Sequence, residues 1–201
     1  MWWSDLRAQG DALSVLTRHL SLEADISPDA RIHGAVVIEA GTRICAGAVI
    51  HGPVWIGRDC MVGNNALIRG SSVIGDRCRI GFSTELKHAR LGSDVSVGPQ
   101  CFIADSRIDE GAYLGALVRT SNHRLDADTV KVLQDGTLHD TGMHKLGAWI
   151  GRGASLGVGV IILPGRIVAP GSEFGPRVTV EKNLPPGRYR LAQHLHFQPL
   201  E

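Results

Sequence analysis

Large aliphatic residues recur at every sixth position over much of this chain. The longest unbroken run is Ile26, Ile32, Ile38, Ile44, Ile50, Ile56, Val62, Ile68, Ile74, Ile80 and Leu86. An α-helix would repeat about every 3.6 residues and a half-buried strand about every 2, so neither explains this spacing. A six-residue repeat is typical of a parallel β-helix, in which short strands and turns alternate around a prism.

Each six-residue unit carries a second inward position, two residues before the aliphatic one, and this position is mostly small. Glycine often follows the aliphatic residue, where it allows turn conformations that a side chain disfavours. Three units predict a triangular coil of roughly 18 residues, stacked on the next at roughly 4.8 Å. Cys60, Cys78 and Cys101 occupy the small inward position. We therefore expect them to act as small packing residues.

The repeat is interrupted at three places. It loses one residue between Leu86 and Leu91 and another between Ile103 and Ile108. After Leu114 it stops until Ile150. We therefore predict about seven coils with an ejected polar loop at 118–147, which is a common place for binding groups on a rigid scaffold. Asp135-Gly136 predicts the turn of a small hairpin within that loop.

The two ends of the chain differ from the repeat. Residues 1–22 place Trp and Leu side chains near helical spacing, which predicts a helical cap on the first coil. An uncovered solenoid end would expose apolar core and unpaired strand edges. Pro185-Pro186-Gly187 predicts the end of the β-helix. The expected organisation is a cap at 1–22, a β-helix at 23–187 and a tail at 188–201.

Composition excludes several classes of function. The net charge is +1, which argues against a dedicated nucleic-acid binder. No apolar run reaches membrane-spanning length, and the N-terminus lacks a basic region followed by an apolar one. We therefore expect no nucleic-acid or membrane partner and a cytoplasmic location.

Four segments occur in an order that resembles one known family: GPVWIGRDCMVGNNALIRGSSVIGDRCRIG, ELKHARLGSDVSVG, TSNHRLDADTVKV and KLGAWIGRGASLGVGVIILPG. They are similar to the C-terminal acetyltransferase domain of the bifunctional glucosamine-1-phosphate acetyltransferase and N-acetylglucosamine-1-phosphate uridyltransferase, especially of archaeal type. The resemblance covers most of 1–187. It implies an all-β, left-handed parallel β-helix, assembled as a homotrimer with acyl-transfer sites between neighbours.

The same resemblance implies acetyl transfer from acetyl-CoA, as co-substrate, to a sugar amine, with no metal. Such a reaction needs a partner for the amine proton, donors for the developing oxyanion and cations for the sugar phosphate. Nothing here resembles the family's nucleotidyltransferase domain, so uridylyl transfer is not expected. The resemblance leaves a separate nucleotidyltransferase open as a partner.

The resemblance also carries over individual residues. Arg69 in ALIRGSS and Lys87 in ELKHA match residues that hold the sugar phosphate, and their side chains suit an anionic ligand. Asn122 in TSNHRLD matches an asparagine beside the acceptor amine. Lys131 matches a loop lysine near the substrate.

The acyl donor is expected along the last coils, where Arg152 and Pro170 occupy CoA-facing positions. Both differ from the small side chains that the family has at these places.

The catalytic wall departs from the family. Where the family has its catalytic histidine, this chain has Pro99, which cannot accept a proton, and Phe102 replaces a tyrosine. Three explanations stay open. His123 supplies the base, with His88 as second candidate; or the acceptor and reaction differ; or the cleft binds a sugar phosphate or nucleotide sugar without chemistry.

The sequence therefore predicts an acyl-CoA-dependent transferase, with acetyl as the acyl group, acting on an amino-sugar phosphate or related small acceptor. The alternative is a catalytically inactive relative that binds a sugar phosphate or nucleotide sugar. A zinc site of the carbonic-anhydrase type is a third hypothesis, since His139 and His144 are five apart, but it lacks a third ligand.

Overall fold

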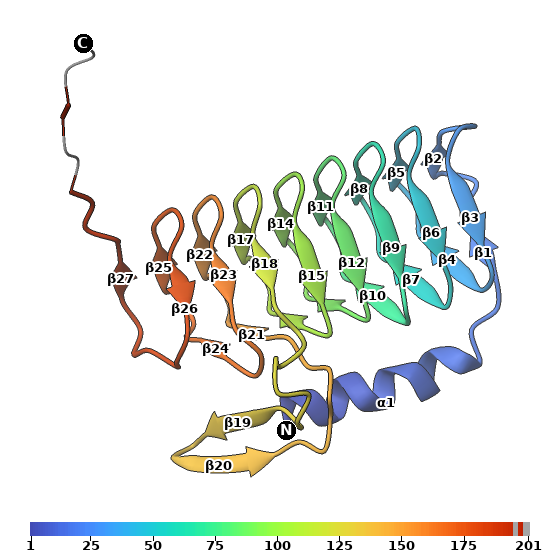
Figure 1. Cartoon of the computed structure of the whole chain (residues 1–201). Coiled ribbons are helices and arrows are strands. Elements are labelled where there is room, and N and C mark those ends of the chain that lie inside the picture. Colours follow the sequence, from blue (N-terminus) through green and yellow to red (C-terminus); the bar gives the residue numbers. More distant parts are fainter. Residues whose placement is uncertain (195–196, 199–201) are drawn as a thin grey trace.

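Three parallel sheets wind around a common axis in the computed structural model, which describes residues 1–194 and 197–198 (Figure 1). Sheet A contains β1 (His19–Leu20), β4 (Val36–Ile38), β7 (Val54–Ile56), β10 (Ser72–Ile74), β13 (Arg90–Leu91), β16 (Arg107–Ile108), β21 (Trp149–Ile150) and β24 (Ile167–Val168). Sheet B contains β2 (Asp25–Ile26), β5 (Arg43–Ile44), β8 (Met61–Val62), β11 (Arg79–Ile80), β14 (Ser96–Val97), β17 (Tyr113–Leu114), β22 (Ser155–Leu156), β25 (Glu173–Phe174) and β27 (Arg188–Tyr189). Sheet C contains β3 (Arg31–His33), β6 (Val49–His51), β9 (Leu67–Arg69), β12 (Glu85–Lys87), β15 (Phe102–Ala104), β18 (Arg119–Thr120), β23 (Ile161–Ile162) and β26 (Thr179–Val180).

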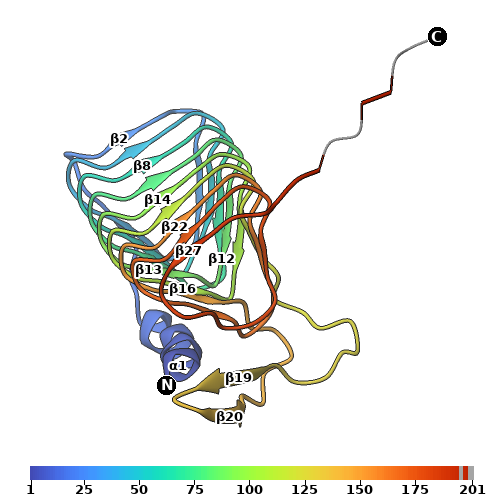
Figure 2. The ribbon, with the colours of Figure 1, turned by 90° about the vertical axis from the view of Figure 1, so that its left-hand side faces the viewer.

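The chain passes from sheet A to B to C in every coil, so the molecule is a parallel β-helix as predicted. In the end view of Figure 2, sheet A lies at the bottom, B at the upper left and C at the right as the chain advances toward the viewer. That order is a left-handed turn. Sheets of 8, 9 and 8 strands make eight complete coils and one strand of a ninth, more than the seven predicted. Two of the additional strands, β1 and β27, lie outside the predicted bounds of 23–187.

The six-residue repeat forms the core. Its large aliphatics stack in ladders inside the prism, and Ile38, Ile56, Ile74 and Leu86 have no exposed surface. The small positions fill the space between them. Cys60, Cys78 and Cys101 are buried there as free thiols, as expected from their positions.

The three edges of the prism are named here by the sheets they join: AB, BC and CA. At the CA edge, two residues, Gly70 and Ser71, separate the last position of β9 from the first of β10. One coil later the register pairs Lys87 with Arg69 and Arg90 with Val73, which leaves only His88 in the corner. The two losses of one residue in the repeat are therefore tightened corners at the CA edge.

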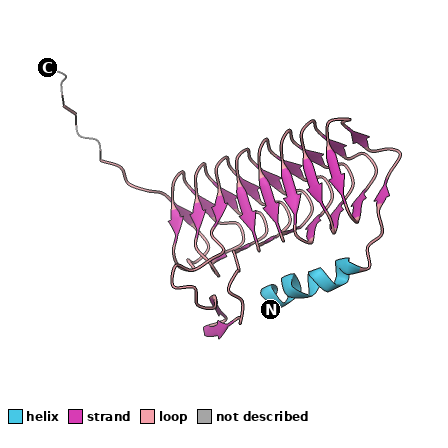
Figure 3. Cartoon of the chain, turned by 45° about the vertical axis from the view of Figure 1, so that its right-hand side comes forward, coloured by secondary structure: helices cyan, strands magenta, loops and turns pink. Residues whose placement is uncertain are grey.

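The N-terminal helix α1 (Trp2–Ser14) forms where it was expected, but it does not cover the first coil. It lies along the CA edge, roughly parallel to the prism axis (Figure 3). Gln9 donates to the carbonyls of Ser71 and Ala89, and Arg107 pairs with Asp5 at 3.1 Å. The helix takes this position because its apolar side chains have a partner there.

That partner is the ejected loop. Trp2, Trp3 and Leu6 pack with Val130, Val132 and Leu146 in a second hydrophobic core beside the prism. The loop leaves after β18 and returns at β21, and it carries the predicted hairpin, β19 (Lys131–Gln134) paired antiparallel with β20 (Thr137–Asp140). Asp135 and Gly136 both have positive φ, of 50° and 76°, as the expected hairpin turn requires.

The solenoid also extends past its predicted end at 187. Strand β27 pairs with β25 and adds the last strand of sheet B, so the Pro-Pro-Gly segment only turns the chain. Tyr189 in β27 stacks on Phe174 at 4.9 Å between ring centroids, which covers the last coil. The tail prediction for 188–201 extends beyond the described residues.

Candidate functional site

A polar cluster lies at the CA edge beneath the ejected loop, and Asp105 is at its centre. The Asp105 carboxylate accepts hydrogen bonds from Lys87 Nζ at 2.8 Å and from Asn122 Nδ2 at 2.5 Å, both through Oδ2. Its other oxygen contacts His88 Nδ1 at 3.0 Å. Asp105 is 4% exposed. Three residues named from the sequence, Lys87, His88 and Asn122, are thus brought together by Asp105, which the sequence analysis did not name.

His88 has an acceptor at each ring nitrogen. Nδ1 lies against the Asp105 carboxylate, and Nε2 lies 2.9 Å from the backbone carbonyl oxygen of Leu6 in α1. Because neither partner can donate a proton, both ring nitrogens must donate, which is the protonated form. The hydrogen bond to Asp105 accordingly raises the pKa of His88. His88 is therefore a poor candidate for the base, since its proton positions are already filled.

Burial of Asp105 would by itself raise the pKa of its carboxyl group. The hydrogen bonds from His88, Lys87 and Asn122 outweigh that effect, so the pKa of Asp105 lies below its ordinary value. The cluster thus holds one carboxylate against two cations. The Asn122 amide must point its nitrogen at Asp105, because a carboxylate only accepts; the Asn122 oxygen is left for another donor.

Arg69 and Lys87 are neighbours on adjacent strands, as expected of two residues predicted to bind one phosphate. Both, however, already form ion pairs with carboxylates of the chain. Arg69 binds Glu85 through Nε at 2.8 Å and through a terminal nitrogen at 2.7 Å. The side chain of Lys87 is 21% exposed, with its ammonium on Asp105. Either cation would have to give up or share its carboxylate to hold a phosphate.

His123 directly follows Asn122 in the sequence and lies in the wall of a hollow of about 520 Å³. We call this the loop hollow; it is lined by Ser121, His123, Arg124, Leu125, Asp126, Leu163, Pro164 and Arg166. The start of the ejected loop forms one wall, and the corner between β23 and β24 forms the other. His123 itself is exposed and pairs through its backbone with Lys145.

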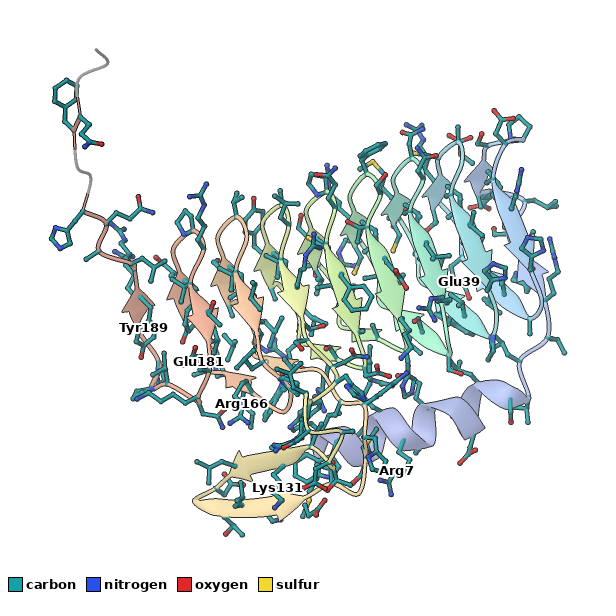
Figure 4. The ribbon with its side chains drawn as sticks, in the orientation of Figure 1. Arg7, Glu39, Lys131, Arg166, Glu181 and Tyr189 are labelled. Carbon is teal, nitrogen blue, oxygen red and sulfur yellow. The ribbon has the colours of Figure 1, made fainter. Side chains whose placement is uncertain are left out.

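The remaining predicted residues lie elsewhere. Lys131 is exposed on hairpin strand β19, outside the loop hollow (Figure 4). Arg152 pairs with Glu110 at 2.6 Å, and its turn and that of Pro170 stack at the AB edge. Sheet A separates this edge from the CA edge. One chain therefore does not bring Arg152 and Pro170 to the Asp105 cluster.

Pro99, at the family's histidine position, is exposed at the BC edge, after β14. Phe102 begins β15 in sheet C, in register with Glu85. The pyrrolidine ring of Pro99 cannot accept a proton, so it cannot replace the imidazole of the family's histidine. Both ring nitrogens of His88 already face hydrogen-bond acceptors, so His123 is the remaining one of the two candidate bases named from the sequence.

The zinc hypothesis gains no support from the placement of its two histidines. His139 packs against the Trp3 ring at 5.7 Å, whereas His144 Nδ1 lies 3.0 Å from the Ala127 carbonyl oxygen. Among the residues described, no three His, Cys, Asp or Glu side chains are grouped closely enough to hold a metal ion.

Sequence reasoning missed Asp105 and Arg166. A signal for Asp105 was present: it lies between Ile103 and Ile108, and His88 lies between Leu86 and Leu91, where the repeat loses a residue. Each single-residue corner has a positive φ, 46° at His88 and 47° at Asp105. Positive φ also occurs at other corners of the prism, such as Asp59, Ser71 and Asp94, so the signal that sets these two corners apart is the missing residue in the repeat.

A three-sided β-helix built from six-residue units, with a polar cluster under an ejected loop, defines the class of hexapeptide-repeat proteins. Comparisons with known proteins agree. A family profile described as the GMPPB C-terminal domain matches residues 17–108. The uncharacterized acetyltransferase YaiX of Escherichia coli strain 536 is 56% identical over 162 residues, which cover 81% of this chain and 70% of YaiX. The chain therefore belongs to the YaiX acetyltransferase family.

A more distant relative confirms the resemblance noted in the sequence. The bifunctional sugar-1-phosphate nucleotidylyltransferase/acetyltransferase of Sulfurisphaera tokodaii is 30% identical over 107 residues, covering 53% of this chain and 27% of that protein. Among solved structures, UDP-N-acetylglucosamine acyltransferase from Campylobacter jejuni has a TM-score of 0.42 at 15% identity, covering 84% of this chain and 69% of that one. No helix among the described residues is long and apolar enough to span a membrane.

Proposed function

We propose that this protein transfers an acetyl group from acetyl-CoA to the amine of an amino-sugar phosphate or a related small acceptor. Membership of the YaiX acetyltransferase family supports acyl transfer. The observation that carries the acceptor site is the Asn122 amide, whose nitrogen is held by Asp105 at 2.5 Å, directly before His123 at the loop hollow. A CoA-dependent enzyme would meet its donor in the cytoplasm, the compartment predicted from the sequence.

The proposed chemistry assigns different tasks to Asn122 and His123. The free Asn122 oxygen accepts a hydrogen bond from the acceptor amine and orients its lone pair toward the thioester carbonyl. His123 takes the proton that the amine loses as the new C–N bond forms and the thiolate of CoA departs. Asp105 acts through Asn122 as a positioning residue, because it fixes which end of the amide is presented.

The test of this function is CoA release from acetyl-CoA with glucosamine 1-phosphate as acceptor. We expect turnover by the wild type and a loss of about a hundredfold or more in His123→Ala, since a positioned base contributes about 10²–10⁴. His19→Ala, an exposed histidine in the first coil, is the matched control and should keep full activity. Equal activity in His123→Ala and His19→Ala would remove His123 as the base.

The runner-up is a relative that binds a sugar phosphate or nucleotide sugar without chemistry. It is favoured by one observation, the replacement of the family's histidine by an exposed proline at Pro99. A thermal midpoint that rises with glucosamine 1-phosphate, without CoA release, would select this function. Absence of any shift with acetyl-CoA or the sugar phosphate would count against both.

We also propose a homotrimer. The donor positions Arg152 and Pro170 lie at the AB edge, whereas the proposed acceptor site lies at the CA edge, so a site that uses both needs a second copy of the chain. Light scattering should give about three times the chain mass of 21.5 kDa. A monomer that is fully active would show that Arg152 and Pro170 do not take part.

A further inference from the structure

The two cations that the family resemblance assigns to the sugar phosphate, Arg69 and Lys87, are both neutralised within the chain. Arg69 has a carboxylate partner in Glu85, and Lys87 has one in Asp105. Arg166, in the corner between β23 and β24, has none: no carboxylate oxygen lies within ion-pair distance of it among the described residues. Its Nε donates to the Pro164 carbonyl at 3.1 Å, and its two terminal nitrogens bind no other described residue.

Arg166 borders the loop hollow and is partly buried (Figure 4). Its side chain comes from a solenoid corner and not from the loop, so a rigid coil fixes its base. Gly165 beside it has φ of 75°, and a side chain there would meet the Lys131 carbonyl oxygen at 2.7 Å. The hairpin therefore packs against this corner on the Gly165 side, and Arg166 lines the hollow.

The charges lining the hollow do not cancel. Arg124 and Asp126 pair with each other through two hydrogen bonds, so together they contribute no net charge. Arg166 then leaves the wall with one unmatched positive charge. Burial, and secondly the nearby Arg124 guanidinium, lower the pKa of Arg166, as expected for a cation with no carboxylate partner beside it. An anion in the hollow would relieve both effects.

We infer that Arg166 is a phosphate-binding residue, which holds a phosphoryl group of a substrate in the loop hollow. The guanidinium offers two terminal N–H groups in a planar fork that matches two phosphate oxygens. Ser121, in the opposite wall of the hollow, has a hydroxyl that can donate a further hydrogen bond. Unlike Arg69 and Lys87, which the family resemblance assigns to the sugar phosphate, Arg166 has no carboxylate partner among the described residues to give up.

The phosphate could come from the acceptor, as in an amino-sugar phosphate, or from the CoA donor. Both present the same chemistry to Arg166. The existence of the phosphate site does not depend on the proposed function, but the identity of its ligand rests on that function. The hollow's volume of about 520 Å³ accommodates either a sugar phosphate or one end of a CoA molecule.

Titration calorimetry with inorganic pyrophosphate tests the site directly, on wild type, Arg166→Gln, Arg166→Lys and Arg79→Gln. Arg79 is exposed in β11 of sheet B, so Arg79→Gln is the matched control that removes one arginine away from the loop hollow. We expect Arg166→Gln to weaken pyrophosphate binding at least about tenfold, as loss of a charge-assisted hydrogen bond does. Arg166→Lys should lie between, and Arg79→Gln should bind as the wild type does.

Two further arms identify the source of the phosphate. One compares acetyl-CoA with its 3′-dephospho form, and the other compares glucosamine 1-phosphate with glucosamine. In the pair that supplies the phosphate, the wild type should prefer the phosphorylated ligand and Arg166→Gln should lose that preference. Pyrophosphate binding that is equal in wild type and Arg166→Gln, or absent in both, overturns the inference. If Arg166→Gln weakens pyrophosphate binding as expected but the wild type shows no acetyl transfer, the phosphate site stands and the proposed function is wrong.

Discussion

At the scale of single residues, one carboxylate organises the proposed site. Asp105 receives hydrogen bonds from three side chains: Lys87 at the end of β12, His88 directly after it, and Asn122, which follows β18. The tightened corners at residues 88 and 105 set these side chains side by side. Removing the carboxylate would leave two neighbouring cations without compensation in a partly buried place, which is expensive because the group left behind stays desolvated.

Asp105→Asn should therefore lower the free energy of unfolding by roughly 3 kcal/mol, the scale of a broken buried ion pair. Asparagine tolerates the left-handed backbone at this corner, so the substitution tests the charge and not the turn. Urea unfolding provides the measurement. Asp94→Asn removes the partner of Arg77 at an exposed AB corner and should change stability little. Equal effects of the two substitutions would refute the central role of Asp105.

The pH dependence follows from His88, whose pKa is raised by its hydrogen bond to Asp105. The folded state binds the His88 proton more tightly than the unfolded state, in which the pKa is about 6.5. The stabilisation is therefore complete below that pH and is lost as pH rises through the higher pKa of the folded state. Asp105, with a lowered pKa, loses its contribution only under acid conditions, as pH falls below about 4.

The stability difference between wild type and His88→Gln should thus shrink as pH rises from 5.5 to 9, because glutamine does not titrate. Urea unfolding at a series of pH values measures it, and NMR titration of the His88 ring supplies its pKa independently. A difference that stays constant over this range would mean that His88 is not protonated in the folded protein.

At the scale of elements, α1 and the ejected loop stabilise one another. Neither has a core of its own: the helix contributes Trp2, Trp3 and Leu6, and the loop contributes Val130, Val132 and Leu146. Arg7 also donates to the Thr141 carbonyl at 2.7 Å. The loop that borders the proposed site is therefore held in place by the first residues of the chain.

Leu6→Ala should cost about 3 kcal/mol, since Leu6 has no exposed surface and its removal leaves a cavity. The loss of stability should be confined to the helix and the loop, because these two segments share this core. Hydrogen exchange should become faster at Val130 and Val132 but not at Ile74 inside the prism. Val15→Ala, at an 83% exposed position next to the same helix, is the control and should change neither. Faster exchange at Ile74 as well would show that the second core is not a separate unit.

At the scale of the whole molecule, stability should depend on position along the prism axis. Each coil contacts only its neighbours, so a central coil is supported on both sides and a terminal coil on one. Ile68 in a central coil has no exposed surface, whereas Ile26 in the first coil is only partly buried. The same side chain thus contributes differently in two places.

Ile68→Ala should lower the free energy of unfolding by about 2–5 kcal/mol, and Ile26→Ala by clearly less. Urea unfolding of both variants, beside Ile161→Ala at a 40% exposed position, measures the gradient. An equal loss for Ile68→Ala and Ile26→Ala would indicate that the first coil is covered in solution, for example by another copy of the chain.

The sequence by itself determined the β-helix, its ladders of buried aliphatics, the ejected loop and its hairpin, because a period of six is a local rule that every coil repeats. It also placed Lys87 and Asn122 among the candidates, through resemblance to a family. Only the tertiary structure decided that Asp105 joins these two, that Arg152 and Pro170 lie at another edge, and that Arg166 enters the loop hollow without a carboxylate. It also decided that α1 lies along the CA edge. These facts depend on contacts between residues tens of positions apart, which a period along the chain does not encode.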